Sequence, residues 1–341
     1  MTKRSSVPPP VTAVLDASSR WLPARLGEVE ERLRQALAGH GEPLGEDAAA
    51  TLAAGGKRLR PMLVLLCAGE AGGDAAVRAA TAIELVHMAT LVHDDVLDAA
   101  PLRRGRPTVV AASGPQRATE VGDLLFSRAF AELAEVPIQD GDDAAAAGAA
   151  RSAGERRVTL LAGASVALAL GELAQRRDAF VLDLPPERYL ARCLLKTARL
   201  FECACAIGRD DPAADEPLTT FGREIGLAFQ ELDDVLDVEG PPERTGKARG
   251  TDLRDGTVTL PLIAALREDP SLAEVDLRSL DEAEAEAVCD RIAGTGALES
   301  CREDARARVE KAKSIISAAP LDAAQRELLT LVADGVVERY S

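Results

Sequence analysis

Two aspartate motifs of identical spacing constrain how this chain can fold. Each motif reads DDVLD, and the second begins 139 residues after the first, counted from Asp94 to Asp233. Their aspartates are Asp94, Asp95 and Asp98 in the first motif and Asp233, Asp234 and Asp237 in the second. On a helix, the first and last aspartates of a motif stand at i and i+4, so both carboxylates project from one face. One copy alone would equally fit a solvated helix edge, whereas two facing copies form a six-carboxylate cage that needs divalent cations.

The surroundings of the motifs indicate which ligands this cage serves. Mg²⁺ prefers carboxylate oxygens and completes its shell with water and phosphate oxygens. Arg103 and Arg104 follow the first motif directly, and a guanidinium binds two phosphate oxygens at once. The stretch GGKRLRP adds Lys57, Arg58 and Arg60 beside two glycines, whose backbone amides can approach an anion closely. The pattern therefore predicts a magnesium-dependent site for phosphorylated substrates.

The fold predicted by the periodicity is all-α. From Trp21 nearly to the C-terminus, apolar residues recur at intervals of three and four, and no useful alternating strand pattern occurs. Aromatic residues make up only 3% of the chain, which favours closely packed helices of Leu, Val, Ile and Ala. We expect residues 1–18 to be a flexible lead-in, residues 19–341 to form one domain, and residues 158–180 to be a buried helix.

Charge and cysteine usage restrict the partners and the compartment. The net charge of −16 argues against nucleic acid as the main partner. Six cysteines show no metal-ligand spacing and lie mostly in apolar helical runs, so we expect reduced core thiols in a cytoplasmic protein. The N-terminus lacks a signal-peptide pattern, and no apolar run reaches the roughly 18–20 residues of a membrane span.

Six motifs in a fixed order resemble the trans-isoprenyl diphosphate synthase (polyprenyl synthetase) family. Between Ala50 and Leu262 they read GGKRLRP, HDDVLDAAPLRRGRPT, GELAQ, KTARLF, FQELDDVLD and GKARGTDLRDGTVTLP. The resemblance implies a bundle of antiparallel helices around a deep central cavity, with the two aspartate helices facing each other at its mouth. It also implies a homodimer and about three Mg²⁺ ions in each active site.

The resemblance assigns roles to individual residues. It implies metal ligation by Asp94, Asp98 and Asp233, with support from Asp95, Asp234 and Asp237. It implies binding of the allylic diphosphate by Arg103, Lys196, Thr197, Gln230 and Lys247. It implies binding of isopentenyl diphosphate, without metal, by Lys57, Arg60, His87 and Arg104. Among these, Asp94, Asp98, Asp233, Lys196 and Lys247 are the residues expected to carry catalysis.

The implied reaction joins isopentenyl diphosphate to an allylic diphosphate. The allylic C–O bond ionises, the isopentenyl double bond attacks the carbocation, and a proton leaves to the departing diphosphate. His87 is then a diphosphate donor or a satisfied helix histidine rather than a general base. Alternatives are a short-chain farnesyl or geranylgeranyl synthase, a class I terpene cyclase, and a subunit of a heteromeric synthase. Three positions depart from the family pattern: Ala99, Glu120 and Thr257, the last where many members carry lysine.

Product length should depend on residues one to three turns before Asp94. Thr90, Ala89, Val86 and Ile83 would line or flank the channel for the growing chain. Ala89 and Thr90 are small, so we predict a product longer than geranylgeranyl, from hexaprenyl to decaprenyl. The alternative is that another helix closes the channel, with Phe126 and Phe130 as candidates.

Overall fold

A computed structural model describes residues 9–18, 21–41, 43–134, 144–210, 215–240 and 248–338. The first half of the bundle consists of α1 (Pro9–Ala17), α2 (Trp21–Leu37), α3 (Leu44–Ala53), α4 (Leu59–Ala68), the short η1 (Glu70–Gly72), α5 (Gly73–Leu97), α6 (Val109–Ser113) and α7 (Pro115–Ala134). The second half consists of α8 (Ala144–Asp178), α9 (Pro186–Cys193), η2 (Leu194–Ala198), α10 (Arg199–Ile207), α11 (Asp215–Glu239), α13 (Thr251–Arg254), α14 (Leu260–Glu268), η4 (Pro270–Glu274), α15 (Glu282–Ala293), α16 (Ala297–Ala318) and α17 (Ala323–Glu338). The all-α prediction is confirmed.

One small hairpin departs from the helical pattern, and it lies beside the first aspartate motif. β1 (Leu102–Arg103) pairs antiparallel with β2 (Arg106–Pro107), with Arg103 opposite Arg106. Arg104 and Gly105 form its turn with φ values of 54° and 73°, the left-handed conformation that tight hairpin turns require. The sequence pattern predicts no strand here, because two residues are too few to show alternation.

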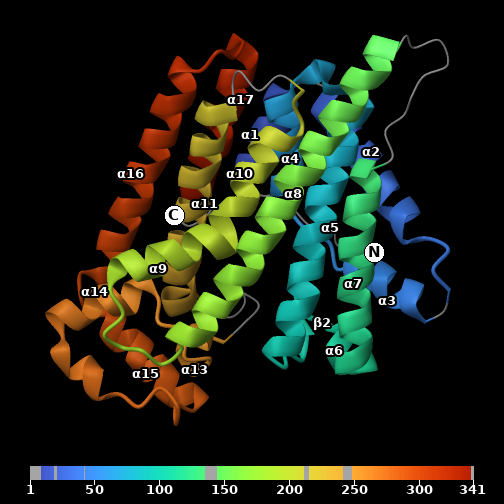
Figure 1. Cartoon of the computed structure of the whole chain (residues 1–341). Coiled ribbons are helices and arrows are strands. Elements are labelled where there is room, and N and C mark those ends of the chain that lie inside the picture. Colours follow the sequence, from blue (N-terminus) through green and yellow to red (C-terminus); the bar gives the residue numbers. More distant parts are fainter. Residues whose placement is uncertain are drawn as a thin grey trace.

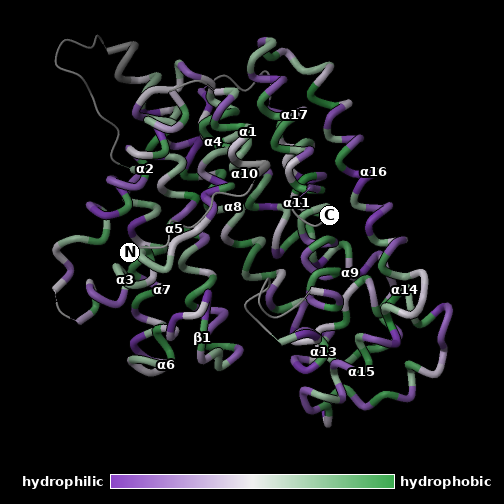
Figure 2. The backbone as a smooth tube through the Cα atoms, turned by 180° about the vertical axis from the view of Figure 1, so that it is seen from behind, coloured by the Kyte–Doolittle hydropathy of each residue, from purple (hydrophilic) through white to green (hydrophobic). Residues whose placement is uncertain are grey.

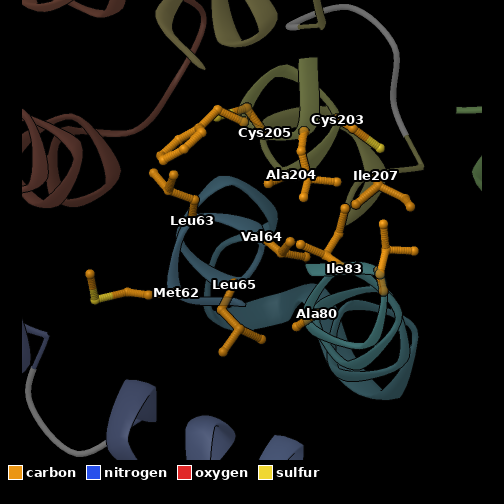
Figure 3. Packing of buried hydrophobic residues seen from close by; sticks show 14 of the residues in the cluster. Met62, Leu63, Val64, Leu65, Ala80, Ile83, Cys203, Ala204, Cys205 and Ile207 are labelled. Atoms are coloured by element: carbon orange, nitrogen blue, oxygen red, sulfur yellow. The ribbon is translucent and has the colours of Figure 1, made fainter. Parts of the chain in front are cut away.

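The core is built around α4, α5 and α10. Figure 3 shows Val64 and Leu65 of α4 packed among Ala80 and Ile83 of α5 and Ala204 and Ile207 of α10. All of these side chains are buried. α5 is apolar along most of its length, whereas the outer helix α16 alternates between polar and apolar residues (Figure 2). This contrast follows from position, because α5 is surrounded by α2, α4, α7 and α10, whereas α16 packs mainly against α11 and α17 and exposes its other side to solvent.

The long helices run side by side along one direction (Figure 1). The C-terminal ends of α5 and α11, which carry the two aspartate motifs, both lie at the end of the bundle occupied by the hairpin, α6 and α13. A second hydrophobic cluster, formed by α9, α13–α15 and neighbouring segments, supports this end of the molecule. The bundle thus places both motifs at one common end.

The predicted flexible lead-in is wrong for residues 9–17. These residues form α1, which packs against α17, and the Val14 side chain is only 1% exposed. Prolines favour an irregular segment in a sequence pattern, but here the two prolines occupy the first turn of the helix, where proline is tolerated.

The prediction of a buried helix over residues 158–180 is wrong for one face. Residues 158–178 belong to α8, which packs against α7 and α10, yet Val166, Leu170 and Leu173 are 60%, 50% and 64% exposed. Within the described residues, the stretches 70–97 and 148–178 are long and apolar enough to cross a membrane by composition. The first is mostly buried as the core helix α5, whereas only 28% of the second window is buried.

Candidate active site

A cavity of about 530 Å³ opens between the two aspartate helices. The acidic side chains in its wall are Asp94, Asp98, Glu172, Asp233, Asp234, Asp252 and Asp255. The basic or potentially basic side chains are Arg60, His87, Arg103, Arg176, Arg192 and Lys196. Its apolar wall includes Leu91, Leu97, Leu168 and Leu200. The structure therefore combines an ionic region contributed by both aspartate motifs with a leucine-lined region in a single cavity.

The first motif divides between this cavity and the protein interior. Asp94 and Asp98 line the cavity, as the i, i+4 spacing predicted. Asp95 is 5% exposed and accepts from Arg103, with both Nε and Nη2 at 2.8 Å from Oδ1. This pair fixes the Arg103 guanidinium at the edge of the cavity. Asp95 thus orients Arg103, the arginine predicted to bind the allylic diphosphate.

Burial makes the charge on Asp94 unfavourable. Burial raises the pKa of Asp94, and the neighbouring carboxylates of Glu172 and Asp98 raise it further, against the opposing charge of Lys196. Raised carboxylate pKa values of this kind are typical of functional sites in which the carboxylates meet a cation.

The second motif is held by a hydrogen-bond network that involves distant residues. Asp234 is 2% exposed; its Oδ2 accepts from the Tyr189 hydroxyl at 2.6 Å and its Oδ1 from Gln230 Nε2 at 2.7 Å. Gln230 Oε1 in turn accepts from Thr197 Oγ1 at 2.6 Å. Burial and the charge of Asp252 raise the pKa of Asp234 well above its ordinary value. Asp233, by contrast, is exposed, and a ligand can reach it from the cavity side.

Asp237 joins the second motif to the segment that follows α11. Its Oδ2 accepts from the backbone N–H of Asp252 at 3.2 Å, and its carbonyl accepts from Gly250 N–H at 3.0 Å. These contacts place α13 over the cavity, so that Asp252 and Asp255 reach its wall. Lys247, predicted to bind diphosphate, lies outside the described residues.

Lys196 reaches the cavity from η2, a single turn of π-helix between α9 and α10. Its Nζ donates to Glu172 Oε2 at 2.6 Å. An ideal Cβ on Gly171 would lie 2.5 Å from the backbone N of Lys196, so only glycine allows α8 and η2 to approach this closely. The Gly and Glu of the GELAQ motif therefore determine where Lys196 lies. The sequence alone predicts no role for Glu172, because its partner Lys196 lies 24 residues away.

Three of the four residues predicted for isopentenyl diphosphate line two adjoining cavities. Arg60 lines the larger cavity, Arg104 lines a smaller one of about 250 Å³, and His87 lines both. Lys57 is exposed, and neither of the two cavity walls includes it. Arg58, which had no assigned role, lines the smaller cavity and is held by Glu30 and by Glu84, the latter at 2.6 Å.

Arg60 and His87 form the junction between these cavities. Arg60 Nη1 is 3.4 Å from His87 Nε2, and its guanidinium lies 4.6 Å from the centre of the Phe201 ring. Burial lowers the pKa of Arg60 to about 10, so it remains a cation at neutral pH. Burial and the charge of Arg60 lower the pKa of His87 well below its ordinary value, so its imidazole is neutral. A neutral imidazole offers one N–H donor, so His87 can donate a hydrogen bond to a substrate but does not contribute positive charge.

The donor set fits divalent cations with oxygen ligands. In the larger cavity the described carboxylates outnumber the described arginine and lysine side chains, although the site is expected to bind anions. Over the described ranges, no three carboxylate, imidazole or thiolate groups converge closely enough to hold one ion. An ion would therefore complete its shell with water and diphosphate oxygens, as Mg²⁺ commonly does.

Fold and site together define a class of all-helical proteins in which two aspartate helices meet at one cavity. Residues 42–293 match the family model described as polyprenyl synthetase. The chain therefore belongs to the polyprenyl synthetase family, whose members are prenyltransferases, and the family prediction is confirmed.

Two curated relatives cover most of this chain. "Heptaprenyl diphosphate synthase component 2" of Geobacillus stearothermophilus is 37% identical over 91% of this chain and 95% of its own length. "Octaprenyl diphosphate synthase" of Escherichia coli is 34% identical over 84% of this chain and 86% of its own length.

A similar solved structure is a polyprenyl synthase from Caulobacter crescentus complexed with calcium and isoprenyl diphosphate. It superposes with a TM-score of 0.85 at 33% identity, over 96% of this chain and 98% of its own. The bundle of the present protein is thus the fold of the polyprenyl synthases.

Proposed function

We propose that this protein condenses isopentenyl diphosphate with an allylic diphosphate, in a Mg²⁺-dependent reaction, to give an all-trans polyprenyl diphosphate longer than geranylgeranyl. The observation that carries the proposal is the cavity in which both aspartate motifs, a lysine and several arginines adjoin a leucine-lined region. Such a cavity matches a substrate with an anionic head and a hydrocarbon tail. The relatives named heptaprenyl and octaprenyl diphosphate synthase support the product range.

In this proposal Asp94, Asp98 and Asp233 hold the metal ions, with about three ions in each site. When bound, the ions would neutralise the allylic diphosphate and stabilise it as it leaves. Arg103, oriented by Asp95, and Lys196, held by Glu172, line the same cavity and would bind the same diphosphate. Thr197 and Gln230 contribute to its binding, as does Lys247.

Isopentenyl diphosphate would bind at the junction of the two cavities. Arg60, His87 and Arg104 supply donors there, and Lys57 lies at the exposed edge. The double bond of this substrate then attacks the allylic carbocation, and the released diphosphate accepts the proton that the new bond displaces. Because His87 is neutral and hydrogen-bonded beside Arg60, we assign it to binding.

Incubation of the purified chain with Mg²⁺, isopentenyl diphosphate and either geranyl, farnesyl or geranylgeranyl diphosphate tests the function. We expect a product ladder that extends beyond geranylgeranyl, resolved by mass spectrometry. Products that stop at farnesyl or geranylgeranyl diphosphate would agree with a prenyltransferase but contradict the proposed product length. A hydrocarbon released with diphosphate would indicate a terpene cyclase instead.

A second candidate is a catalytic subunit that requires a partner chain. The relative from Geobacillus stearothermophilus is named component 2 of its enzyme. Elongation by this chain alone would exclude the requirement, whereas elongation only after a second polypeptide is added would establish it.

Product length gives a prediction that the structure sharpens. Thr90 lines the larger cavity beside Leu91, whereas Ala89 and Val86 are fully buried in the core. We expect Thr90→Phe to shorten the main product by at least one isoprene unit, because a ring would fill the leucine-lined region. Ala89→Phe remains a prediction of the same kind, and Thr90→Ser is the matched control. Product distributions are measured by mass spectrometry. An unchanged distribution in both phenylalanine variants would show that residues of another helix close the channel.

The exposed stripe of α8 supports a homodimer. Val166, Leu170 and Leu173 recur at helical spacing on one face, whereas Leu168 lines the cavity. Apolar stripes of this kind typically lie in subunit interfaces. The six free, buried cysteines support a reducing, cytoplasmic location.

We expect Leu170→Asp to convert the dimer to a monomer, because a carboxylate would be buried in the interface. Light scattering coupled to gel filtration measures the mass, and Leu102→Asp, at a residue of similar exposure on the hairpin, is the control. A wild-type protein that is already monomeric would exclude a homodimer formed through the apolar stripe of α8.

A further inference from the structure

The contact between Glu172 and Lys196 has no assigned function. Gly171 brings the backbone of α8 against that of η2, and the next residue, Glu172, projects into the cavity beside Lys196. Lys196 Nζ lies 2.6 Å from Glu172 Oε2, and Arg176 Nε lies 3.2 Å from Glu172 Oε1. Both carboxylate oxygens of Glu172 are therefore occupied by cations of the chain itself.

Lys196 has competing partners on the opposite wall. Burial lowers its pKa, but the charges of Asp94, Glu172 and Asp98 outweigh this effect and raise it overall. A lysine has a flexible four-carbon stem and pairs with whichever carboxylate its ammonium can reach. Without Glu172, the largest remaining attraction on the ammonium would come from Asp94, a proposed metal ligand that lines the same cavity.

We propose that Glu172 is a positioning residue that holds the Lys196 ammonium on the α8 wall. Asp94 and Asp98 then stay available to divalent cations, and Lys196 stays beside the diphosphate. When the diphosphate binds, Lys196 keeps its contact with Glu172 through one N–H and donates to the substrate through another, since an ammonium has three donors. The inference rests on the proposed function for the identity of the diphosphate.

The variant Glu172→Gln tests this role because it keeps the shape and removes the charge. We expect Mn²⁺ affinity, followed by electron paramagnetic resonance in the presence of inorganic diphosphate, to fall by about tenfold as Lys196 pairs with Asp94. KM for the allylic diphosphate should rise by a similar factor, about tenfold, with a smaller change in kcat. Glu172→Asp keeps the charge on a shorter stem and should recover part of both quantities; it also carries the test if the glutamine variant fails to fold.

The matched control is Glu299→Gln, which removes an exposed ion pair with Arg306 on α16. It should bind Mn²⁺ and substrate like the wild type. If the wild type elongates and Glu172→Gln equals it in Mn²⁺ affinity and in KM, the inference is overturned and the proposed function stands. A wild type that binds Mn²⁺ with diphosphate but does not elongate would overturn the proposed function. In that case the Mn²⁺ affinities of the wild type and Glu172→Gln would still test whether Glu172 positions Lys196.

Discussion

Asp94→Asn is expected to lower kcat by about 10³-fold, the largest effect among single substitutions in the cavity. Asparagine keeps the size of the side chain but replaces an anionic oxygen with an amide, which is a poor ligand for Mg²⁺. Asp94 and Asp98 share one helix face, so the loss would weaken the site that both form. Steady-state kinetics over a Mg²⁺ titration would measure the effect, with product formation followed by mass.

A stability measurement separates loss of the metal ligand from loss of the fold. Burial raises the pKa of Asp94, so its ionised form costs folding free energy in the metal-free protein at neutral pH. The neutral amide of the Asp94→Asn variant would remove that cost, and the metal-free variant should therefore unfold at a temperature equal to or above that of the wild type. The control is Asp290→Asn, at an exposed aspartate of α15 that pairs with Arg249. An Asp94→Asn variant that retains kcat within about threefold of the wild type would contradict the proposed site.

Gly171→Ala is expected to disturb the site through the backbone. The new Cβ would lie 2.5 Å from the N and 2.8 Å from the Cα of Lys196, and these are backbone atoms that cannot rotate away. Separating α8 from η2 should cost about 1–3 kcal/mol of stability, the usual range for overpacking. A displacement of Lys196 by about 1 Å can lower kcat by about 10²-fold, because the proposed contact between Lys196 and the diphosphate depends on position.

The same helix offers a matched control in Gly148→Ala. Gly148 lies in α8, and nothing lies within 4 Å of an ideal Cβ there. Alanine should leave activity unchanged and raise the free energy of unfolding by about 0.5–1 kcal/mol, since alanine favours helix over glycine. Thermal unfolding and kcat measured on both variants test the argument; equal behaviour at the two positions would show that the close approach at Gly171 is unimportant.

The helical fold and both aspartate motifs could be predicted because their signals are local. The intervals of three and four identify a helix, and the i, i+4 spacing identifies the face that carries Asp94 and Asp98. The order of the motifs identified the family, which the family model and the relatives confirm. The same local information indicated that α8 is apolar, but not that three of its apolar side chains are exposed.

The contacts that organise the site join residues far apart in the chain. One contact is local: Asp95 of α5 holds Arg103 of β1, eight residues further along the chain, and its support of metal binding stays a prediction. Tyr189 reaches Asp234 over 45 residues, and Lys196 reaches Glu172 over 24. Helical periodicity indicates which face of a helix carries a side chain. It does not indicate which neighbouring helix packs against that face, or at which residues the two helices meet.

The sequence by itself determined that this chain is a helical polyprenyl synthetase with two aspartate motifs. Tertiary structure decided that Thr90 rather than Ala89 lines the cavity and that the GELAQ segment sets the position of Lys196. The reason is that local propensity and spacing are properties of one helix, whereas a cavity wall depends on how closely several helices approach. That approach is set by side-chain volume at the crossing points, such as the absent side chain of Gly171.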